Sequence, residues 1–528
     1  MSLITKQAYW TLSISQFVFF LTLATMVLYH IPLYSFVSDN LALDSLHGVA
    51  VLLSVICIIF LVSLVIFSLI ALLLPFLLKP FAIIIALLNA AAVYFLQTYQ
   101  VILDKSMMGN ILNTRNEESL DFLTPSFLAY IVLLGLIPSW LIIKTQIKKA
   151  GRVRLIVKVI ASLIVGALFV YMNASSWLWI DKHAKTLGGK ILPWSYIMNT
   201  ARHYSEQSKG SKKQQLLPTA TFLDDKKEVV LLIIGETARA QNFSLYGYKR
   251  KTNPLLENKK GLVGYSDTWA CSTYTTASVA CILSHTDNDP SAFEPLPSYL
   301  NRHGVDVIWR TKNWGEPPIK VNEYLESADL EANCEGDDCK FDGLLLTGLK
   351  QRIESSKQNK IFVVLHTKGS HGPSYFTRYP KGFDVFKPIC KSVELNKCTE
   401  QELLNAYDNS ILYTDYFLNK TIDLLASLEG IPSTLMYVSD HGESLGEFGL
   451  YLHGTPYSFA PDFQKKVPFM VWLSDDFQAL KAYKNIPTLN NNKHSQANIF
   501  HSVLGALGVE SEIYDKKLDV YRQFLISE

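Results

Sequence analysis

The hydrophobic positions are unevenly distributed along the chain, and the long apolar runs lie in its first third. Five runs are long enough to cross a bilayer, near residues 9–29, 48–72, 78–99, 124–144 and 155–175. An α-helix needs about 20 mostly apolar residues to span the hydrocarbon core. The pattern therefore predicts an α-helical membrane domain with five transmembrane helices over residues 1–175. A large soluble protein is the alternative, but it would have to bury all five runs.

The basic residues between these runs predict how the helices are oriented. Six of them lie around the junction of the fourth and fifth runs: Lys144, Lys148, Lys149, Arg152, Arg154 and Lys158. The loop at residues 31–47 has no lysine or arginine. Because short cytoplasmic loops are enriched in these residues, we expect a cytoplasmic N-terminus. Five crossings then place the remainder of the chain outside the cytoplasm.

The segment after the fifth run is suited to the membrane surface. It contains Trp177, Trp179, Trp194 and Tyr196, and such aromatic residues favour the membrane–water boundary. We expect one amphipathic helix here, followed by a polar linker, SEQSKGSKKQQ, at residues 205–215. Residues 176–215 thus join the membrane domain to a soluble domain at residues 216–528.

Six of the seven cysteines lie in this soluble domain, and they form three close pairs along the chain. The pairs are Cys271 and Cys281, Cys334 and Cys339, and Cys390 and Cys398. Six cysteines permit about 15 pairings, but local bonds are the simplest and an oxidising compartment allows them. Structural zinc is the rival interpretation, and the paired CxxC motifs that it favours are absent.

Short runs rich in β-branched residues predict an α/β fold for the soluble domain. They lie at residues 228–235, 305–310, 360–366, 433–439 and 467–473, separated by helical stretches. This arrangement is typical of buried strands in a parallel sheet. Ligands bind at the carboxyl ends of the strands in such sheets.

Acidic and imidazole side chains follow the ends of several of these strands. Glu236 follows the first and His371 the third, while Asp440 and His441 directly follow the fourth. With His453 they form a set of oxygen and nitrogen ligands that zinc accepts. Each histidine alone is more typical of a structural or surface role, but the convergence favours a metal site. The segment CSTYTTASVAC at residues 271–281 offers five serine and threonine hydroxyls, and the residues alone do not select the nucleophile.

Several motifs together resemble the phosphoethanolamine transferases that modify lipid A, which include the mobile colistin-resistance enzymes. They are GETARAQNFSLYGY (235–248), CSTYTTASVAC (271–281), GSHGPSYFTRYP (369–380), AYDNSILYTD (406–415) and YVSDHGESLGEFGLYLHG (437–454). The resemblance covers nearly the whole chain. It implies an alkaline phosphatase/sulfatase-like fold for the soluble domain. It also implies a multi-pass protein of the bacterial inner membrane whose catalytic domain lies in the periplasm.

The resemblance also implies roles for particular residues. Thr275 matches the nucleophile, and Glu236, Thr275, Asp440 and His441 match the ligands of a catalytic zinc. His371 and His453 match histidines that hold a second zinc or the substrate phosphate. The three cysteine pairs match bonded pairs of the family. The implied reaction moves phosphoethanolamine from phosphatidylethanolamine to Thr275 and then to an envelope acceptor, expected to be lipid A.

A second match lies in the outer loop between the third and fourth runs. Asn110, Thr114 and Glu118 are four residues apart, so a single helix would place them on one face. The family uses the matching residues to hold the lipid donor's head group, and a carboxylate suits an ethanolammonium group. A polar face on a surface helix is the alternative interpretation.

One segment departs from the pattern of the colistin-resistance enzymes. After the strand at residues 305–310 the chain reads TKNWGEPPIK, where those enzymes have a shorter stretch with polar substrate-contacting residues and a lysine. Asn313 and Lys320 are candidates for these roles. Because the alignment through the Pro-Pro turn is ambiguous, the acceptor contacts, and with them the choice among lipid A, a core sugar, a glycan and a protein, stay open.

Other functions fit the sequence less well. A phosphoglycerol transferase or sulfatase-like hydrolase shares the metal and hydroxyl nucleophile, but the 235–248 and 271–281 motifs argue against it. An inactive membrane sensor or scaffold is also an alternative, although none of the matched metal ligands is missing. The formal net charge of +2 and the absence of an arginine-rich segment give no reason to expect a nucleic-acid partner.

Overall fold

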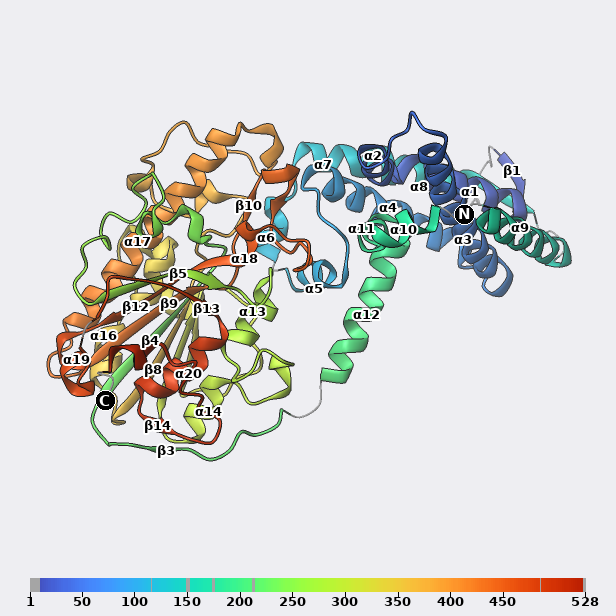
Figure 1. Cartoon of the computed structure of the whole chain (residues 1–528). Coiled ribbons are helices and arrows are strands. Elements are labelled where there is room, and N and C mark those ends of the chain that lie inside the picture. Colours follow the sequence, from blue (N-terminus) through green and yellow to red (C-terminus); the bar gives the residue numbers. More distant parts are fainter. Residues whose placement is uncertain are drawn as a thin grey trace, which may run out of the picture. The chain divides into compact units, whose positions relative to one another are not determined.

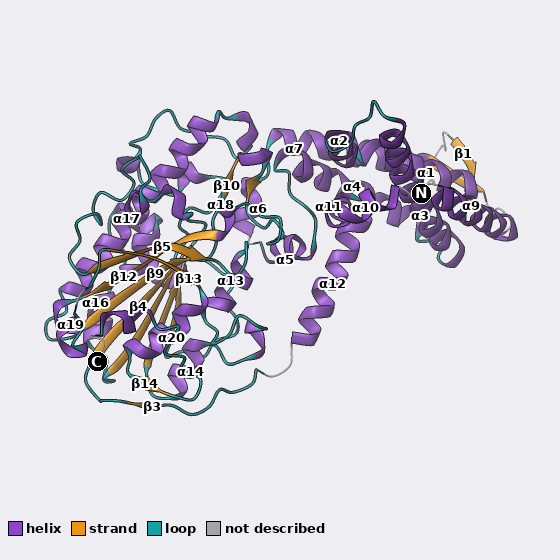
Figure 2. Cartoon of the chain, in the orientation of Figure 1, coloured by secondary structure: helices purple, strands orange, loops and turns teal. Residues whose placement is uncertain are grey.

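The computed structural model describes residues 10–114, 116–148, 152–172, 176–210, 214–484 and 486–525. The chain divides into two compact units, Met1–Tyr204 and Ser205–Glu528. The first is helical and the second is built on a β-sheet with helices on both faces (Figures 1 and 2). The fold thus combines an apolar helical unit with an α/β unit.

The helices of the first unit correspond to the apolar runs, but not all are regular spans. Its longer helices are α1 (Ile14–Tyr29), α2 (Ile31–Asp39), α3 (Leu46–Leu73), α4 (Leu78–Thr98), α7 and α8 (Pro125–Tyr130 and Ile137–Lys144, joined by a π-helical turn at Ile131–Leu136) and α9 (Arg152–Met172). By length and composition, three described helices can cross a membrane: Leu46–Leu73, Leu78–Thr98 and Pro125–Lys144. The pair α1 and α2 adds a fourth if it is one span bent by 57°. The prediction of five regular spans is therefore not met in full.

Helix α9 is not among these three, because its described apolar stretch is shorter. It has 21 residues, a length of about 30 Å, which matches the bilayer core. Its first two turns contain Arg152, Arg154 and Lys158, and its described apolar stretch is Leu155–Phe169. Apolar side chains such as Leu163 and Val165 are exposed on it, as expected for a surface that lipid covers. A fifth crossing by α9 stays a prediction.

The segment after α9 forms three helices instead of the single one expected. They are α10 (Trp177–Lys182), α11 (Ala184–Lys190) and α12 (Trp194–Gly210). Gly188, Gly189 and Pro193 lie at or near the break between α11 and α12, and glycine and proline disfavour a continuous helix. Helix α12 continues to Gly210, so part of the predicted linker is helical.

The second unit contains an eight-stranded sheet in the order β13-β5-β12-β9-β4-β8-β6-β7. The strands are β4 (Glu228–Gly235), β5 (Leu262–Trp269), β6 (Asp306–Thr311), β7 (Glu323–Glu326), β8 (Lys360–His366), β9 (Ser433–Ser439), β12 (Lys466–Leu473) and β13 (Leu489–Ser495). All five predicted strands are present. Strand β12 is antiparallel to both of its neighbours, so the prediction of a wholly parallel sheet was wrong.

The central strands are buried on both faces because their side chains alternate between two hydrophobic clusters. Val230, Leu232 and Ile234 of β4 pack in one cluster with residues of α13 (Thr275–Ile282), α14 (Leu296–Arg302) and α20 (Ala497–Ala506). The intervening Val229, Leu231 and Ile233 pack in the other with residues of α16 (Leu349–Glu354) and α17 (Glu400–Ala426). A strand covered on both faces reads as a continuous apolar run, which is why β4 was recognisable.

The orientation predicted from the loop charges can be tested by reporter fusions. Alkaline phosphatase fused after residue 215 should be active, and a fluorescent protein fused there should be dark. The reason is that five crossings from a cytoplasmic N-terminus place residue 215 outside the cytoplasm. A fluorescent protein fused after residue 148 should be bright, because the basic junction is cytoplasmic. Fluorescence after both positions would show that α9 does not cross and that the second unit is cytoplasmic.

Candidate metal and catalytic site

The site begins at one edge of the sheet, where three parallel strands end. Strand β4 ends at Gly235, β8 at His366 and β9 at Ser439, and β4 pairs in parallel with both of the others. The backbone N–H of Asp440 donates to the carbonyl of Gly235 over 3.0 Å, so the β9 end is tied to the β4 end. Glu236 and Asp440 therefore leave the sheet side by side.

Four donor atoms converge at this edge. The Nε2 atom of His441 lies 3.2 Å from Oδ2 of Asp440 and 3.6 Å from Oε1 of Glu236. The Oγ1 atom of Thr275 lies 3.4 Å from Oε2 of Glu236 and 3.3 Å from Nε2 of His441. One ligand atom from each of Glu236, Asp440 and His441 lies within 4.8 Å of the others. All four side chains are buried, so these donors meet away from solvent.

The hydrogen bonds leave one atom of Asp440 and one atom of His441 directed to the centre. Oδ1 of Asp440 accepts from the backbone N–H groups of Thr237 and His441, whereas its buried Oδ2 has no hydrogen-bond partner. Nδ1 of His441 lies 3.0 Å from the carbonyl of Gly442, which favours the proton on Nδ1 and a lone pair on Nε2. Carboxylate oxygen and imidazole nitrogen in this arrangement fit a divalent cation such as zinc.

Electrostatics supports the same conclusion. Burial, together with the nearby charge of Asp440, raises the pKa of Glu236 to about 7. Burial raises the pKa of Asp440 to about 7, and it lowers the pKa of His441 to about 4. Two buried carboxylates side by side are unfavourable without a compensating positive charge. A bound cation would supply that positive charge, with Glu236 and Asp440 ionised and the imidazole of His441 neutral.

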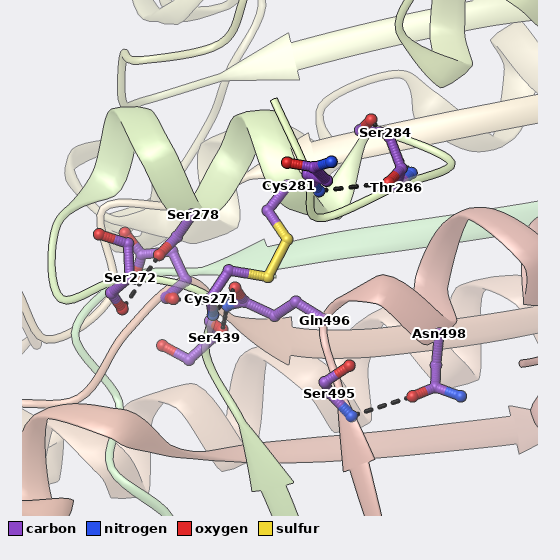
Figure 3. Close-up of a disulfide and its surroundings, with 12 residues drawn as sticks. Cys271, Ser272, Ser278, Cys281, Ser284, Thr286, Ser439, Ser495, Gln496 and Asn498 are labelled. Carbon is purple, nitrogen blue, oxygen red and sulfur yellow. Dashed lines mark hydrogen bonds between the residues drawn. A yellow bond between two sulfur atoms is a disulfide. The ribbon is translucent and has the colours of Figure 1, made fainter. Parts of the chain in front are cut away.

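Thr275 is held at the first position of helix α13. The disulfide between Cys271 and Cys281 closes the segment that precedes Thr275 onto the same helix (Figure 3). The hydroxyl of Thr273 donates to the carbonyl of Thr455 over 2.6 Å, so it is engaged elsewhere. The structure thus brings the hydroxyl of Thr275 to the metal-type ligands. The Cys334–Cys339 and Cys390–Cys398 bonds are also present, as expected.

Gln496 is a site residue that the sequence did not reveal. Its Oε1 accepts from the backbone N–H of Cys271, and its Nε2 donates to the carbonyls of Ser439 and Asp440 (Figure 3). This buried amide therefore joins the nucleophile segment to the end of β9. It lies between β13 and α20, and β13 (LNNNKHS) is too polar to be recognised as a strand.

His371 and His453 lie beside this centre, where a substrate phosphate or second metal could bind. The ring centroid of His453 is 4.2 Å from that of His441 and 5.7 Å from that of His371. Nδ1 of His453 lies 3.3 Å from Oε2 of the buried Glu443. Burial, together with the positive charge of Lys368, holds the pKa of His371 well below its usual value, so its ring is neutral.

Of the two candidates in the TKNWGEPPIK segment, the structure brings one to the site. Nδ2 of Asn313 donates to Oε2 of Glu236 over 2.6 Å and to the carbonyl of Thr367 over 3.1 Å. Lys320 is exposed and lines a surface cavity instead. Asn313 thus contacts a metal-type ligand directly.

The three candidates in the first unit do not share one helix face. Helix α5 (Lys105–Asn113) ends before Thr114, and α6 (Asn116–Asp121) follows. The Thr114 hydroxyl donates to the carbonyl of Asn110 over 2.7 Å, and such local bonds compete with helix propagation. The expectation of a single helix was therefore wrong. The side chain of Glu118 lies outside the described residues.

Comparison with known proteins agrees with this site and fold. A family model described as Sulfatase matches residues 228–509, and one described as Phosphoethanolamine transferase EptA/EptB matches residues 58–208. The chain is 36% identical over 509 residues to phosphoethanolamine transferase EptA of Helicobacter pylori, covering 94% of each chain. It is 34% identical over 426 residues to phosphatidylethanolamine transferase Mcr-1 of Escherichia coli, covering 75% of this chain and 78% of the relative.

A solved structure extends the similarity to the membrane unit. The integral membrane lipooligosaccharide phosphoethanolamine transferase A (EptA) from Neisseria meningitidis superposes with a TM-score of 0.90 and 28% identity. The match covers 98% of this chain and 99% of that chain. Together with the buried threonine, carboxylates and imidazole described above, these matches show that the chain belongs to the EptA family of phosphoethanolamine transferases.

Proposed function

We propose that this protein transfers phosphoethanolamine from phosphatidylethanolamine to lipid A through a phosphoethanolamine-threonine intermediate on Thr275. The observation that carries the proposal is the position of the Thr275 hydroxyl, 3.3 Å from Nε2 of His441 and 3.4 Å from Oε2 of Glu236. The names of the family members support the donor group and the lipid acceptor. We place the protein in the bacterial inner membrane, with residues 1–175 as the membrane domain, 176–215 as the connection and 216–528 as a periplasmic catalytic domain.

Zinc is the cofactor that best fits the ligand set. Glu236, Thr275, Asp440 and His441 would hold it, and zinc would favour the ionised hydroxyl and balance negative charge on the phosphoryl group. Hydrogen bonds from the backbone orient two of these ligands. Two backbone N–H groups fix Asp440, and the carbonyl of Gly442 orients the His441 ring.

Thr275 acts as the nucleophile in the first step. Its Oγ1 forms a bond to phosphorus, the bond from phosphorus to the glycerol oxygen breaks, and diacylglycerol leaves. Thr275 is the first residue of α13, so its Oγ1 lies at the N-terminal end of this helix. The backbone N–H groups and dipole of a helix N-terminus favour negative charge. In the second step an acceptor phosphate or hydroxyl takes the phosphoethanolamine group from Thr275.

His371 and His453 are placed to bind the phosphoryl oxygens or move protons. The leaving glycerol oxygen must gain a proton, and the acceptor must lose one. The neutral His371 ring can accept or donate a hydrogen bond, and Glu443 orients the His453 ring from its far side. A second zinc on the same two histidines is compatible with their positions. Either role stabilises charge on the group being transferred.

The residues matched to a head-group site lie in the region of helices α5 and α6. We propose that Asn110, Thr114 and Glu118 hold the ethanolammonium and its neighbouring oxygens. The Glu118 carboxylate matches the positive ammonium in charge, and Asn110 and Thr114 supply neutral polar groups. Their proximity in sequence, across the break between α5 and α6, supports this proposal.

Trapping the intermediate tests the nucleophile. Purified protein given phosphatidylethanolamine should carry one phosphoethanolamine on the peptide that contains Thr275, as measured by mass spectrometry. Thr275→Ala should lose this adduct and more than about 10³-fold of transfer activity, because the Thr275 hydroxyl contacts both Glu236 and His441. The Thr237 hydroxyl contacts Glu236 alone among these ligands in the described structure. Thr276→Ala is the matched control and should keep both. Release of free phosphoethanolamine without an adduct would indicate hydrolysis by a direct attack of water.

Zinc should stabilise the protein more at high pH than at low pH. In the metal-free protein the pKa values of Glu236 and Asp440 are raised to about 7, so folding takes up protons and stability falls as pH rises through this value. Zinc requires both carboxylates ionised, whereas His441, with a pKa of about 4, is already neutral. The rise in Tm on adding zinc should therefore be small at pH 5 and reach its full size near pH 8. Asp440→Asn should abolish most of it, and an equal rise at both pH values would contradict this assignment.

The donor role of Glu118 predicts a change in KM. Glu118→Gln should raise KM for phosphatidylethanolamine about 10-fold with little change in kcat, because a charge-assisted hydrogen bond contributes about 1.5–3 kcal/mol. Glu117→Gln, at the neighbouring position of α6, is the control and should leave KM unchanged. Equal KM values for the wild-type protein, Glu118→Gln and Glu117→Gln would show that Glu118 does not bind the donor.

A further inference from the structure

The loop at residues 312–321 (KNWGEPPIKV, here the 312–321 loop) contacts two components of the site. Its Asn313 donates to Oε2 of Glu236 over 2.6 Å. Its Gly315 has a φ of +110°, and a Cβ atom at this position would lie 3.3 Å from Cγ2 of Thr275. The loop backbone thus packs on the proposed nucleophile while its amide binds a metal-type ligand. The position of this loop therefore bears on both groups.

The centre of the loop is anchored by one carboxylate that touches neither group. Oε1 of Glu316 accepts from the Tyr324 hydroxyl over 2.5 Å. Oε2 of Glu316 lies 3.7 Å from Nδ1 of His366, the fully buried last residue of β8. Oε2 and both ring nitrogens of His366 have no hydrogen-bond partner among the described residues. A shift of less than about 1 Å would bring Oε2 and Nδ1 within hydrogen-bond distance.

The other described polar contacts of the loop lie toward its two ends, and Ile319 and Val321 pack against the hydrophobic core near the second of these. Its first residue donates from the Lys312 N–H to the carbonyl of His366, and near its other end the Lys320 N–H donates to Oγ of Ser298. The outer side of the loop is a surface cavity of about 600 Å³. Glu316 therefore holds the middle of the loop from the inside. Burial tends to raise the pKa of Glu316, but the nearby charge of His366 and the hydrogen bond from the Tyr324 hydroxyl hold it below its usual value, so the carboxylate is ionised.

We infer that Glu316, held by His366 and Tyr324, is a positioning residue that keeps the 312–321 loop against Thr275 and Glu236. Loosening this anchor would let Asn313 leave Glu236 and Gly315 leave Thr275. The orientation of the hydroxyl would then be lost, although no reacting group is removed. The inference rests on the proposed function, in which Thr275 is the nucleophile.

Kinetics of the full-length, zinc-loaded protein test the inference. Glu316→Gln should form the Thr275 adduct about 10-fold more slowly at saturating phosphatidylethanolamine, with KM within about twofold of wild type, because misplacement by about 1 Å lowers the rate of the chemical step. Glu323→Gln is the matched control. Its carboxylate, 23% exposed against 14% for Glu316, pairs with Arg310 and Arg352 instead of His366. This control should keep the wild-type rate.

Two further measurements separate positioning from general damage. His366→Gln, and the double variant that combines it with Glu316→Gln, should form the adduct no more than about twofold more slowly than Glu316→Gln alone. The reason is that both substitutions remove the same interaction. Hydrogen exchange of the metal-free protein should be several-fold faster in peptides from the 312–321 loop of Glu316→Gln, and not of Glu323→Gln. An adduct rate or loop exchange equal to wild type would overturn the inference. A wild-type protein that forms no adduct would instead overturn the proposed function, and exchange alone would then decide whether Glu316 anchors the loop.

Discussion

Two buried carboxylates lie side by side at the end of the sheet, and the remainder of the catalytic unit is arranged around them. Glu236 and Asp440 follow adjacent parallel strands, so the backbone pairing of β4 with β9 forces them together. Water cannot screen their repulsion, because both are buried. Protonation or a bound cation can relieve it, and their pKa values of about 7 show how strongly the site favours one of these outcomes at neutral pH. A cation allows the site to keep both acids ionised and directs them to one point.

Segments far apart in the sequence hold these acids in place. Gln496 links the backbone of Cys271 to that of Asp440, and Asn313 binds Glu236 from the 312–321 loop. A disulfide joins the segment before Thr275 to the helix that follows it. Each contact removes freedom from a donor group that a cation or phosphoryl group needs in a fixed position. The geometry therefore depends on the whole unit and not on one motif.

Much of the fold was predictable where local pattern decides it. The runs for β4, β8 and β9 predicted the strands well because these strands are apolar on both faces, and the residues directly after β4 and β9 lie together as expected, in the candidate site. Strand direction depends on contacts between distant segments, so the antiparallel β12 could not be recognised from its own apolar run. Strands β7 and β13 are polar edge strands and have no such run. Gln496 was not predicted either, because its role depends on backbone groups that only the fold brings to it.

The membrane unit shows a related limit of sequence patterns. A hydropathy window measures apolar length, and it does not detect a bend such as the 57° angle between α1 and α2. Helix α9 has basic first turns, which suit the cytoplasmic boundary by the charge rule that predicted its orientation. Similarly, a spacing of four residues predicted one helix face for Asn110, Thr114 and Glu118, but the hydroxyl of Thr114 caps the carbonyl of Asn110 where α5 ends.

The sulfatase-type sheet edge supplies chemistry that many substrates could use, so specificity must come from what surrounds it. Around Thr275 these surroundings are the disulfide-closed 271–281 segment, the 312–321 loop and the two histidines His371 and His453. The loop contains two consecutive prolines, which restrict its backbone to few conformations at these positions. A stiff loop held at one central carboxylate can be altered in sequence on its outer side without moving Asn313 or Gly315. Side chains on the outer side of the loop can therefore change while the atoms around Thr275 keep their positions.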